Sequence, residues 1–430
     1  MNSSWRQIAQ ASALYCAIAL GFAIPISTAA SNLLMALTLL FTLLAGNLRA
    51  HVRTLAHSPV ALAATAYCAL VLLGCLWGEG SWADQQHYLG KYLALLLIPL
   101  LVPLFGEPRH QRGALAAFCA AMLLTLLIST ALWLDLLRWL PAEILTKIAQ
   151  GRDPAYLPGQ NAVVFKLSIT HGFLMAIAAY LLLLAAQAQH GRWRVLCVTL
   201  ALLAAINVLF MIIGRTGYVV LGVLGCYLFV TRLAPHLGRR GVAIALLACA
   251  IPATAVYEFS ETLNARVHKA IDEASHWQQG QGNRTSIGLR FDYYSNTLAI
   301  IREQPLLGVG TGGFTHAYDA RIQGTAMAAS NNPHNQYLLT TAQFGLPGLA
   351  LLLLLYFSHW RSSRQLPETL RHIARGVLLA YLVGNLFNSF MLDFSERLFF
   401  AWITGVLFGI SATEKKTACL QECPSTTSPV

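Results

Sequence analysis

The chain has 430 residues, of which only 11% are charged while 56% are hydrophobic. Soluble proteins carry about 25% charged residues, so these proportions exclude a water-facing globule, and they also exclude a disordered or fibrous chain. The apolar residues suffice for about twelve stretches of the ~20 residues that cross a bilayer. Runs such as Leu93 to Leu104 are apolar on every face, which excludes the alternating pattern of a transmembrane barrel. The sequence therefore predicts an all-α polytopic membrane protein.

Apolar runs between charged, Pro or Gly breaks predict about twelve transmembrane helices. In chain order they are 10–26, 31–46, 59–77, 90–105, 114–134, 164–187, 195–213, 217–231, 241–257, 337–358, 376–391 and 397–411. The first lacks a small-residue cleavage site and is expected to remain as an anchor. These bounds divide the chain into helices one to nine (1–257), a loop (258–336), helices ten to twelve (337–411) and a tail (412–430).

The distribution of basic residues predicts the orientation. With a cytoplasmic N-terminus, the cytoplasmic segments hold more than half of the 29 Lys and Arg residues, and their only acidic residues are Glu107, Glu368, Glu414 and Glu422. The basic residues are Arg6, Arg49, Arg53, Arg109, Arg112, Arg192, Arg194, Arg232, Arg239, Arg240, Arg361, Arg364, Arg371, Arg375, Lys415 and Lys416. By the positive-inside rule, both termini are expected in the cytoplasm.

The net charge of +11 could suggest nucleic acid, but topology explains where the basic residues lie, and no nucleic-acid partner is predicted. Seven of the nine cysteines lie in apolar spans, so no loop carries a disulfide framework. Cys419 and Cys423 in the tail could bind a metal, but there is no second pair, and a reduced cytosolic tail is preferred. No metal site is predicted.

The loop 258–336 is the longest segment that is predicted to lie outside the membrane on the side opposite the cytoplasm. Apolar residues recur at helical spacing over Glu258 to Gln279 and over Ser286 to Glu303. These two stretches predict amphipathic helices that lie on the outer membrane surface. Gly280 to Asn283 and the glycines between 308 and 313 are expected to form turns or a flexible loop. We expect the function to reside on this face.

Three isolated basic residues lie at span edges on this face. Arg215 must sit at the membrane boundary, where an Arg tends to mark a ligand, although it could also bind lipid phosphate. Arg290 lies in the second loop helix and could instead pair with Asp292. His334 follows Pro333 at the opening of an apolar helix, whose N-terminus disfavours imidazolium. A neutral His334 could accept a proton, or it could be a capping or headgroup residue.

Three weaker positions complete the set. Lys91 opens the fourth span and could either add to a phosphate site or extend to the membrane surface. Arg321 is a further candidate in the loop. Asp393 and Arg397 bracket the last outside turn and are interpreted as a structural pair, with substrate binding by Asp393 as the alternative.

The order of these motifs resembles the bacterial O-antigen ligase and polymerase family over about Ile212 to Gly409. Each motif alone is common, and the ordered set is what makes the resemblance specific. The motifs are the hairpin Gly214-Arg215-Thr216-Gly217, then Arg290 with Glu303-Gln304-Pro305-Leu306-Leu307-Gly308-Val309-Gly310, His334-Asn335-Gln336-Tyr337-Leu338, the turn Gly345-Leu346-Pro347-Gly348-Leu349, and Asn385-Leu386-Phe387-Asn388 to Asp393 and Arg397.

The resemblance implies a C-type glycosyltransferase of the bacterial inner membrane that takes a glycan from undecaprenyl diphosphate on the periplasmic face. Arg215, Arg290 and His334 occupy positions that the family uses. Two guanidiniums suit a diphosphate leaving group, and a His suits proton removal from an acceptor hydroxyl. Lys91 and Asp393, with Arg321, are expected substrate-binding residues. No cofactor or metal is implied, and direct attack would invert the anomeric carbon.

An O-antigen ligase acting on lipid A-core is the leading hypothesis, because about twelve spans, cytoplasmic termini and one dominant late loop match it best. The O-antigen polymerase uses the same donor but tends to have two comparable loops, whereas the earlier loop 135–163 is much shorter here. A protein-directed oligosaccharyltransferase usually has a C-terminal extension. A secondary transporter or lipid flippase should carry charges at the membrane midplane. The sugars and the oligomeric state are not predicted.

Overall fold

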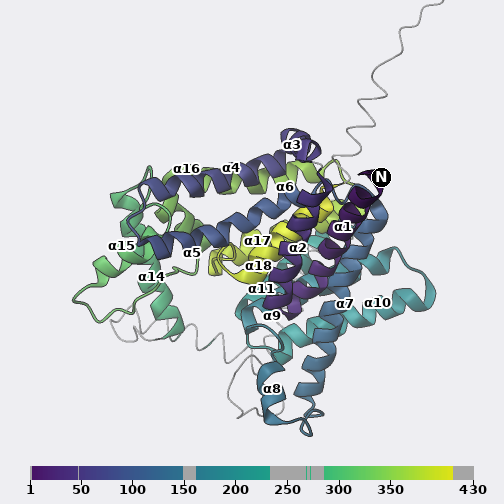
Figure 1. Ribbon diagram of the computed structural model, residues 1–430. Coiled ribbons are helices and arrows are strands. Elements are labelled where there is room, and N and C mark those ends of the chain that lie inside the picture. Colours follow the sequence, from purple (N-terminus) through teal and green to yellow (C-terminus); the bar gives the residue numbers. More distant parts are fainter. Residues whose placement is uncertain are drawn as a thin grey trace, which may run out of the picture.

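The computed structural model describes residues 2–46, 48–148, 161–232 and 285–409, together with His268 and Asp272. All regular structure in these ranges is helical, which confirms the predicted all-α class for them (Figure 1). The predicted span 241–257, the predicted loop helix Glu258 to Gln279 apart from His268 and Asp272, and the tail 412–430 lie outside the described residues.

The helices of the main bundle are α1 (Asn2–Ile26), α2 (Thr28–Ala45), α4 (Pro59–Leu73), α7 (Pro108–Trp133), α9 (Ser168–Gln187), α10 (Gly191–Ile206), α11 (Arg215–Arg232), α16 (Gln336–Ser363), α17 (Glu368–Phe387) and α18 (Phe394–Leu407). The other helices are α3 (Leu48–His57), α5 (Trp82–Tyr92), α6 (Leu97–Leu101), α8 (Ala142–Ile148), α14 (Ser286–Glu303) and α15 (Gly313–Ile322). Single turns of 3-10 helix occupy Gly74–Leu76 and Leu93–Leu96, and a π-helix occupies Asn207–Met211.

Seven helical segments in the described ranges are long and apolar enough to cross a membrane. They are Ser4–Ile26, Thr28–Ala45, Pro59–Leu76, Pro108–Trp133, Ser168–Gln187, Gly191–Met211 and Gln336–Ser363, and each coincides with a predicted span. The predicted span 90–105 is instead broken into the end of α5, a 3-10 turn and α6. Pro99 and Pro103 remove backbone donors there, which accounts for the break. The total of twelve stays a prediction.

The core of the bundle lies around α9, α17 and α18. Trp402 of α18 is fully buried, and its Nε1 donates to the carbonyl oxygen of Ala17 at 2.8 Å. The indole ring lies so close to Gly21 of α1 that a Cβ there would collide with it. Small residues at such crossings allow helices to approach closely, and in lipid this packing is a main source of association between helices.

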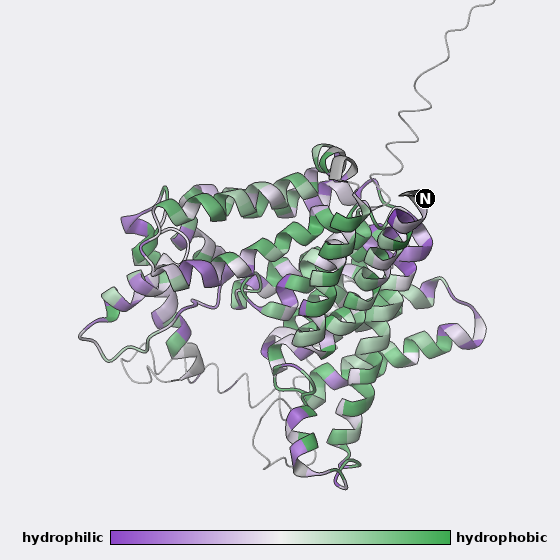
Figure 2. Ribbon diagram, in the orientation of Figure 1, coloured by the Kyte–Doolittle hydropathy of each residue, from purple (hydrophilic) through white to green (hydrophobic). Residues whose placement is uncertain are grey.

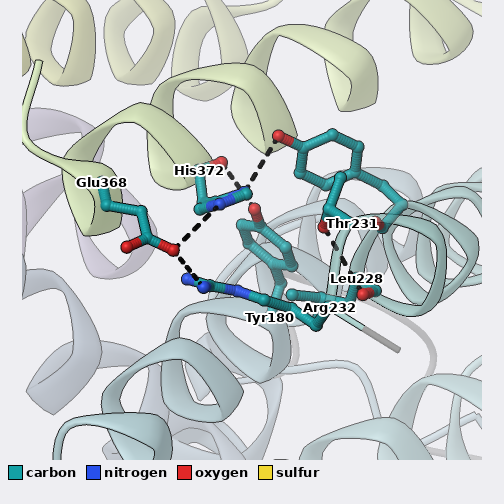
Figure 3. A network of polar contacts seen from close by, with 7 residues as sticks. Tyr180, Leu228, Thr231, Arg232, Glu368 and His372 are labelled. Carbon is teal, nitrogen blue, oxygen red and sulfur yellow. Dashed lines mark hydrogen bonds and ion pairs between the residues drawn. The ribbon is translucent and has the colours of Figure 1, made fainter. Parts of the chain in front are cut away.

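A polar network joins α9, α11 and α17 (Figure 3). Glu368 lies between Arg232, with which it forms an ion pair, and His372, whose Nε2 is 3.9 Å from the carboxylate. The Tyr227 hydroxyl is 3.1 Å from Nδ1 of His372, and the Tyr180 hydroxyl donates to the His372 carbonyl at 2.5 Å. The network fixes the C-terminal end of α11.

Helices α14 and α15 lie at the opposite end of the molecule from the N-terminus and α3 (Figure 1). Hydrophobic residues cover the bundle helices, and hydrophilic residues gather near the helix ends, among them the end formed by α14, α15 and the start of α5 (Figure 2). Helix α14 begins and ends at the predicted residues, Ser286 and Glu303, so this helix is confirmed. Its placement on a membrane surface stays a prediction.

The glycine-rich segment 308–313 forms the predicted turns, and it is packed against neighbouring elements. Three of its glycines have positive φ, and the segment packs between α4 and α16. At Gly310, where φ is 75°, a Cβ would lie 2.5 Å from the Cα of Gly78. Only glycine fits this close approach without strain, so the segment is a packed element of the bundle.

The same segment explains a break in α16. At Gly345, φ is 61° and ψ is −161°, which ends the first part of the helix before Pro347 begins the second. Because the break leaves carbonyl groups without helical donors, the backbone N–H groups of Val309 and Gly310 donate to the carbonyls of Ala342 and Gln343, at 2.9 and 2.8 Å. The predicted span 337–358 is therefore a broken helix.

Candidate functional site

Arg215 is the first residue of α11 and is half-buried. Its position follows from two glycines that bring α9 and α11 together. A Cβ at Gly214 would lie 2.6 Å from the carbonyl oxygen of Ser168, and one at Gly217 would lie 3.0 Å from Gly172. Neither position has room for a side chain, so this contact fixes the point at which the Arg215 side chain leaves the backbone.

Arg290 lies in the second turn of α14, which Thr285 caps by accepting from the N–H of Gly288 at 3.1 Å. Four residues later, Tyr294 lies on the same face of the helix. Its hydroxyl donates to the carbonyl of Leu386, near the end of α17, at 3.1 Å. This contact holds α14 against the bundle and places the half-buried Arg290 beside it.

His334 lies in the loop between α15 and α16 and has a φ of 57°, which is uncommon for a residue with a side chain. Its N–H donates to Oδ1 of Asn332 at 2.8 Å. The next residue, Asn335, caps α16 and also donates from its side chain to the carbonyl of Leu386 at 3.1 Å. The imidazole ring is 6.0 Å from the Tyr293 ring. Contacts on both sides therefore fix the His334 backbone.

The three leading residues come together at this end of the bundle. Burial lowers the pKa of the Arg290 guanidinium, and the neighbouring charge of Arg215 lowers it further. Burial also lowers the pKa of His334, and the charge of Arg290 adds to this effect. In the described part of the chain, neither arginine has a carboxylate within 4.0 Å. The result is two unpaired guanidiniums beside an imidazole that is mostly neutral at pH 7.

Lys91 and Asp393 lie close to each other near this group. The Tyr88 hydroxyl of α5 donates to the carbonyl of Asn331 at 2.6 Å, which ties α5 to the loop that carries His334. The Lys91 ammonium is 5.5 Å from the Tyr88 ring centre. Burial raises the pKa of Asp393 to about 6, and the charges of Lys91 and Arg397 oppose this rise.

Arg321 lies apart from the other predicted residues. It is in α15, where it forms an ion pair with Glu303, the last residue of α14. Arg290 lies near the other end of α14, about 13 residues or ~20 Å away at 1.5 Å per residue. Arg397 donates to the carbonyl of Leu392 at 2.9 Å, and its pairing with Asp393 stays a prediction.

Residues 200–353 match the family model described as O-antigen ligase. This region belongs to the O-antigen ligase family. The family region contains α11, α14, α15 and the first part of α16, and with them Arg215, Arg290 and His334. The family resemblance predicted from the ordered motifs is thereby confirmed, and the apolar helices make the chain a membrane protein.

A curated protein of Haemophilus influenzae (strain ATCC 51907 / DSM 11121 / KW20 / Rd), described as an uncharacterized protein, is 27% identical over 160 residues. The match covers 35% of this chain and 38% of that protein. Lys91 and Asp393 lie outside the matched residues 200–353, and they are close enough for their charges to interact.

The family region rests on a buried polar network that the sequence did not indicate. Gln336, the first residue of α16, accepts from the N–H of Met391 at 3.0 Å and donates to the hydroxyl of Thr340 at 3.0 Å. The Thr340 hydroxyl is 3.2 Å from that of Tyr67 in α4. Buried polar groups that satisfy one another in this way hold their elements in one arrangement. This buried network therefore supports the loop that carries His334.

Two further charged residues near the site were missed. Lys166 is 6% exposed and donates to the hydroxyl of Thr28 at 3.1 Å, while Glu396 is 1% exposed in the first turn of α18. A charge three residues after Asp393, at the start of an apolar helix, was the available signal for Glu396. Within the described ranges, no cluster of three or more His, Cys, Asp and Glu side chains could hold a metal ion.

Proposed function

We propose that the protein is an O-antigen ligase of the bacterial inner membrane. It transfers O-antigen polysaccharide from undecaprenyl diphosphate to a sugar hydroxyl of lipid A-core on the periplasmic face. The observation that carries the proposal is the meeting of Arg215, Arg290 and His334 within one region of the O-antigen ligase family. This trio combines an anion site with a group that can take a proton.

The two arginines bind the diphosphate of the donor. A guanidinium stays charged at any physiological pH and presents a planar fork of donors that matches two phosphate oxygens. As the bond between the anomeric carbon and the phosphate oxygen breaks, its electron pair passes to the diphosphate. Arg215 and Arg290 stabilise this developing charge, and their half-buried setting strengthens the interaction.

His334 is the general base. It accepts the proton of the acceptor hydroxyl while the acceptor oxygen forms a bond to the anomeric carbon. Undecaprenyl diphosphate leaves from the opposite side, so the anomeric configuration inverts. The energy comes from the glycosyl diphosphate bond, and the reaction needs neither a metal nor a nucleotide cofactor.

Lys91 and Asp393 form the second side of the donor site. Lys91 adds a positive charge for the diphosphate, and Asp393 holds Lys91 and Arg397 toward the site. Arg321 contributes to substrate binding at a distance, through the glycan and not through the diphosphate, because its guanidinium is paired with Glu303.

Both termini face the cytoplasm, and the donor, the acceptor and the surrounding membrane lipids are the partners. The O-antigen polymerase is the alternative within the family, because it uses the same donor with a second lipid-linked glycan as the acceptor. The much shorter predicted loop 135–163 favours the ligase.

A deletion strain tests the proposal. Loss of a ligase leaves full-length O-chains on the lipid carrier and lipid A-core without O-chain, and the wild-type gene restores the attachment. Core with a single repeat would indicate a polymerase instead. Unchanged lipopolysaccharide would contradict both functions.

A further inference from the structure

A polar pocket of about 460 Å³ lies between α14, α15 and the segment that precedes α5. Its volume falls within the range of about 300–1,000 Å³ that is typical of small-molecule sites. Polar side chains form most of its wall, and a few aliphatic ones complete it. The lining residues are Glu79, Ile300, Glu303, Gln304, Val309, His316, Ala317, Ala320 and Arg321.

The wall of the pocket is preformed. The N–H of Glu79 donates to the carbonyl of Val309 at 3.2 Å, and Nε1 of Trp77 donates to the carbonyl of Leu307 at 3.2 Å. Because the glycine-rich segment 308–313 is packed into the bundle, the pocket is attached to a rigid element. Binding there therefore needs little ordering of the protein.

The charges in the pocket select against phosphate. The carboxylates of Glu79 and Glu303 face one cation, Arg321, which is already paired with Glu303. Gln304 donates to Glu79 at 2.9 Å, and Nδ1 of His316 lies 4.0 Å from the same carboxylate. No surplus positive charge remains for an anion. Carboxylates, an amide and an imidazole can instead exchange hydrogen bonds with hydroxyl groups.

We propose that this pocket binds a neutral oligosaccharide. The inference rests on the proposed ligase function, and it adds a glycan subsite about 20 Å from Arg290 along α14. At that distance the bound sugars belong to a part of the donor glycan remote from the diphosphate, or to the oligosaccharide of the acceptor. Hydroxyl groups bind to the polar wall, and the side chains of Ala317 and Ala320, which are not buried, contact the apolar face of a sugar ring.

A space-filling substitution tests the subsite. Ala320 is exposed on α15 and lines the pocket, so Ala320→Trp fills it without disturbing the core. Asp319 is the exposed neighbour that does not line it, so Asp319→Trp is the matched control. The probe is the polysaccharide released from the strain's own lipopolysaccharide by mild acid, titrated into the purified full-length protein and followed by saturation-transfer NMR.

We expect the probe to bind the wild type and Asp319→Trp alike, and Ala320→Trp at least about tenfold more weakly, which corresponds to about 1.4 kcal/mol. Equal affinity of all three proteins, or no binding to the wild type, would overturn the subsite. This binding needs no transfer. A wild type that binds the glycan but transfers none would contradict the ligase function and leave the subsite intact.

Kinetics then identify the source of the sugars. A higher KM for a donor with a long glycan, with no change for a donor carrying one sugar, assigns the subsite to the donor. A higher KM for lipid A-core assigns it to the acceptor. If Ala320→Trp changes neither KM, the assignment of the bound sugars to the donor or the acceptor is overturned.

Discussion

At the scale of single residues, Arg215 and Arg290 are distinguished by the absence of a carboxylate partner among the described residues. Both are half-buried near an apolar bundle, their like charges are close enough to affect each other, and neither has a carboxylate partner among the described residues. Two unpaired like charges in such a setting oppose folding, since each loses hydration without gaining a partner. A bound diphosphate would relieve this conflict.

Lysine variants test whether phosphate binding needs the planar donors of the guanidinium group in addition to its positive charge. We predict that Arg215→Lys and Arg290→Lys each lose most O-chain attachment while their abundance in the membrane stays normal, because an ammonium cannot bind two phosphate oxygens in one plane. Immunoblots and lipopolysaccharide gels measure both quantities. Arg138→Lys, at an exposed ion pair with Asp135, is the control. Wild-type attachment in both site variants would contradict bidentate recognition.

His334 should act in chemistry and not in donor binding. We predict that His334→Gln loses transfer by about 10²–10⁴-fold, the usual contribution of a general base, while it still binds the lipid-linked donor. Glutamine keeps hydrogen bonding but cannot take up a proton at neutral pH. Single-turnover rates and donor binding in detergent separate the two effects. A variant with near-native transfer would leave the arginines and substrate proximity as the main source of catalysis.

The pH dependence follows from the direction of the pKa shift. Burial and Arg290 lower the pKa of His334 below its ordinary 6.5, so the imidazole is already neutral at pH 7. The rate should therefore be flat from neutrality upward and fall only as the pH drops below about 6.5, where the base becomes protonated. Asp393 has a pKa of about 6 and could produce a similar decline. The decline should persist in Asp393→Asn if His334 causes it, and it should vanish if Asp393 does.

The sequence indicated Arg215, Arg290 and His334 as candidates because their motifs occur in a specific order, and their roles stay predictions. It could not predict Tyr294 or Gln336 as supports of the site. The role of each depends on a partner far away in the sequence, Leu386 of α17 for Tyr294 and Met391 of the turn before α18 for Gln336, and no local pattern predicts such a contact.

At the scale of elements, the glycine-rich segment 308–313 is where sequence reasoning was weakest. Glycines indicate that a turn is possible, but they do not distinguish a mobile loop from a close-packed one. The break in α16 at Gly345 falls in the turn predicted from Gly345 to Leu349, but the hydrogen bonds that complete it come from residues far away in the sequence and were not predicted. By contrast, the bounds of α14 follow from apolar spacing and a Thr cap, which are local features.

Gly310 and Gly324 have nearly equal φ values, so substitutions at these two positions distinguish the cost of backbone strain from the cost of overpacking. Gly310 (φ 75°) would place a Cβ 2.5 Å from Gly78, whereas Gly324 (φ 78°) has open space around it. We predict that Gly310→Ala destabilises the protein by about 1–3 kcal/mol more than Gly324→Ala, since only the former overpacks the bundle. Thermal unfolding of both variants in the same detergent measures the difference. Equal melting temperatures would mean that the segment is not packed as described.

At the scale of the whole molecule, composition and the uniformly apolar runs were enough to predict an all-α membrane protein, because 11% charged residues is far below the about 25% of soluble proteins. The number of membrane spans was harder to predict from the sequence. Prolines broke one predicted span, and hydropathy alone does not show whether an apolar run is one helix or two.

Topology is the prediction that belongs to this scale. The bias of basic residues toward one set of loops predicts that reporter fusions after Arg239 and Arg371 report the cytoplasm, and that one near Gln279 reports the periplasm. Paired alkaline phosphatase and fluorescent protein fusions at each position measure this. A cytoplasmic signal near Gln279 would place the proposed site on the wrong side of the membrane.

Reconstitution tests the central claim most directly. Purified protein in liposomes receives undecaprenyl-diphosphate-linked O-antigen and lipid A-core, with EDTA present and no nucleotide. We predict that O-antigen becomes attached to lipid A-core with release of undecaprenyl diphosphate, and that His334→Gln forms almost no product. Extension of the lipid-linked glycan without product on lipid A-core, or equal product from His334→Gln, would contradict the account.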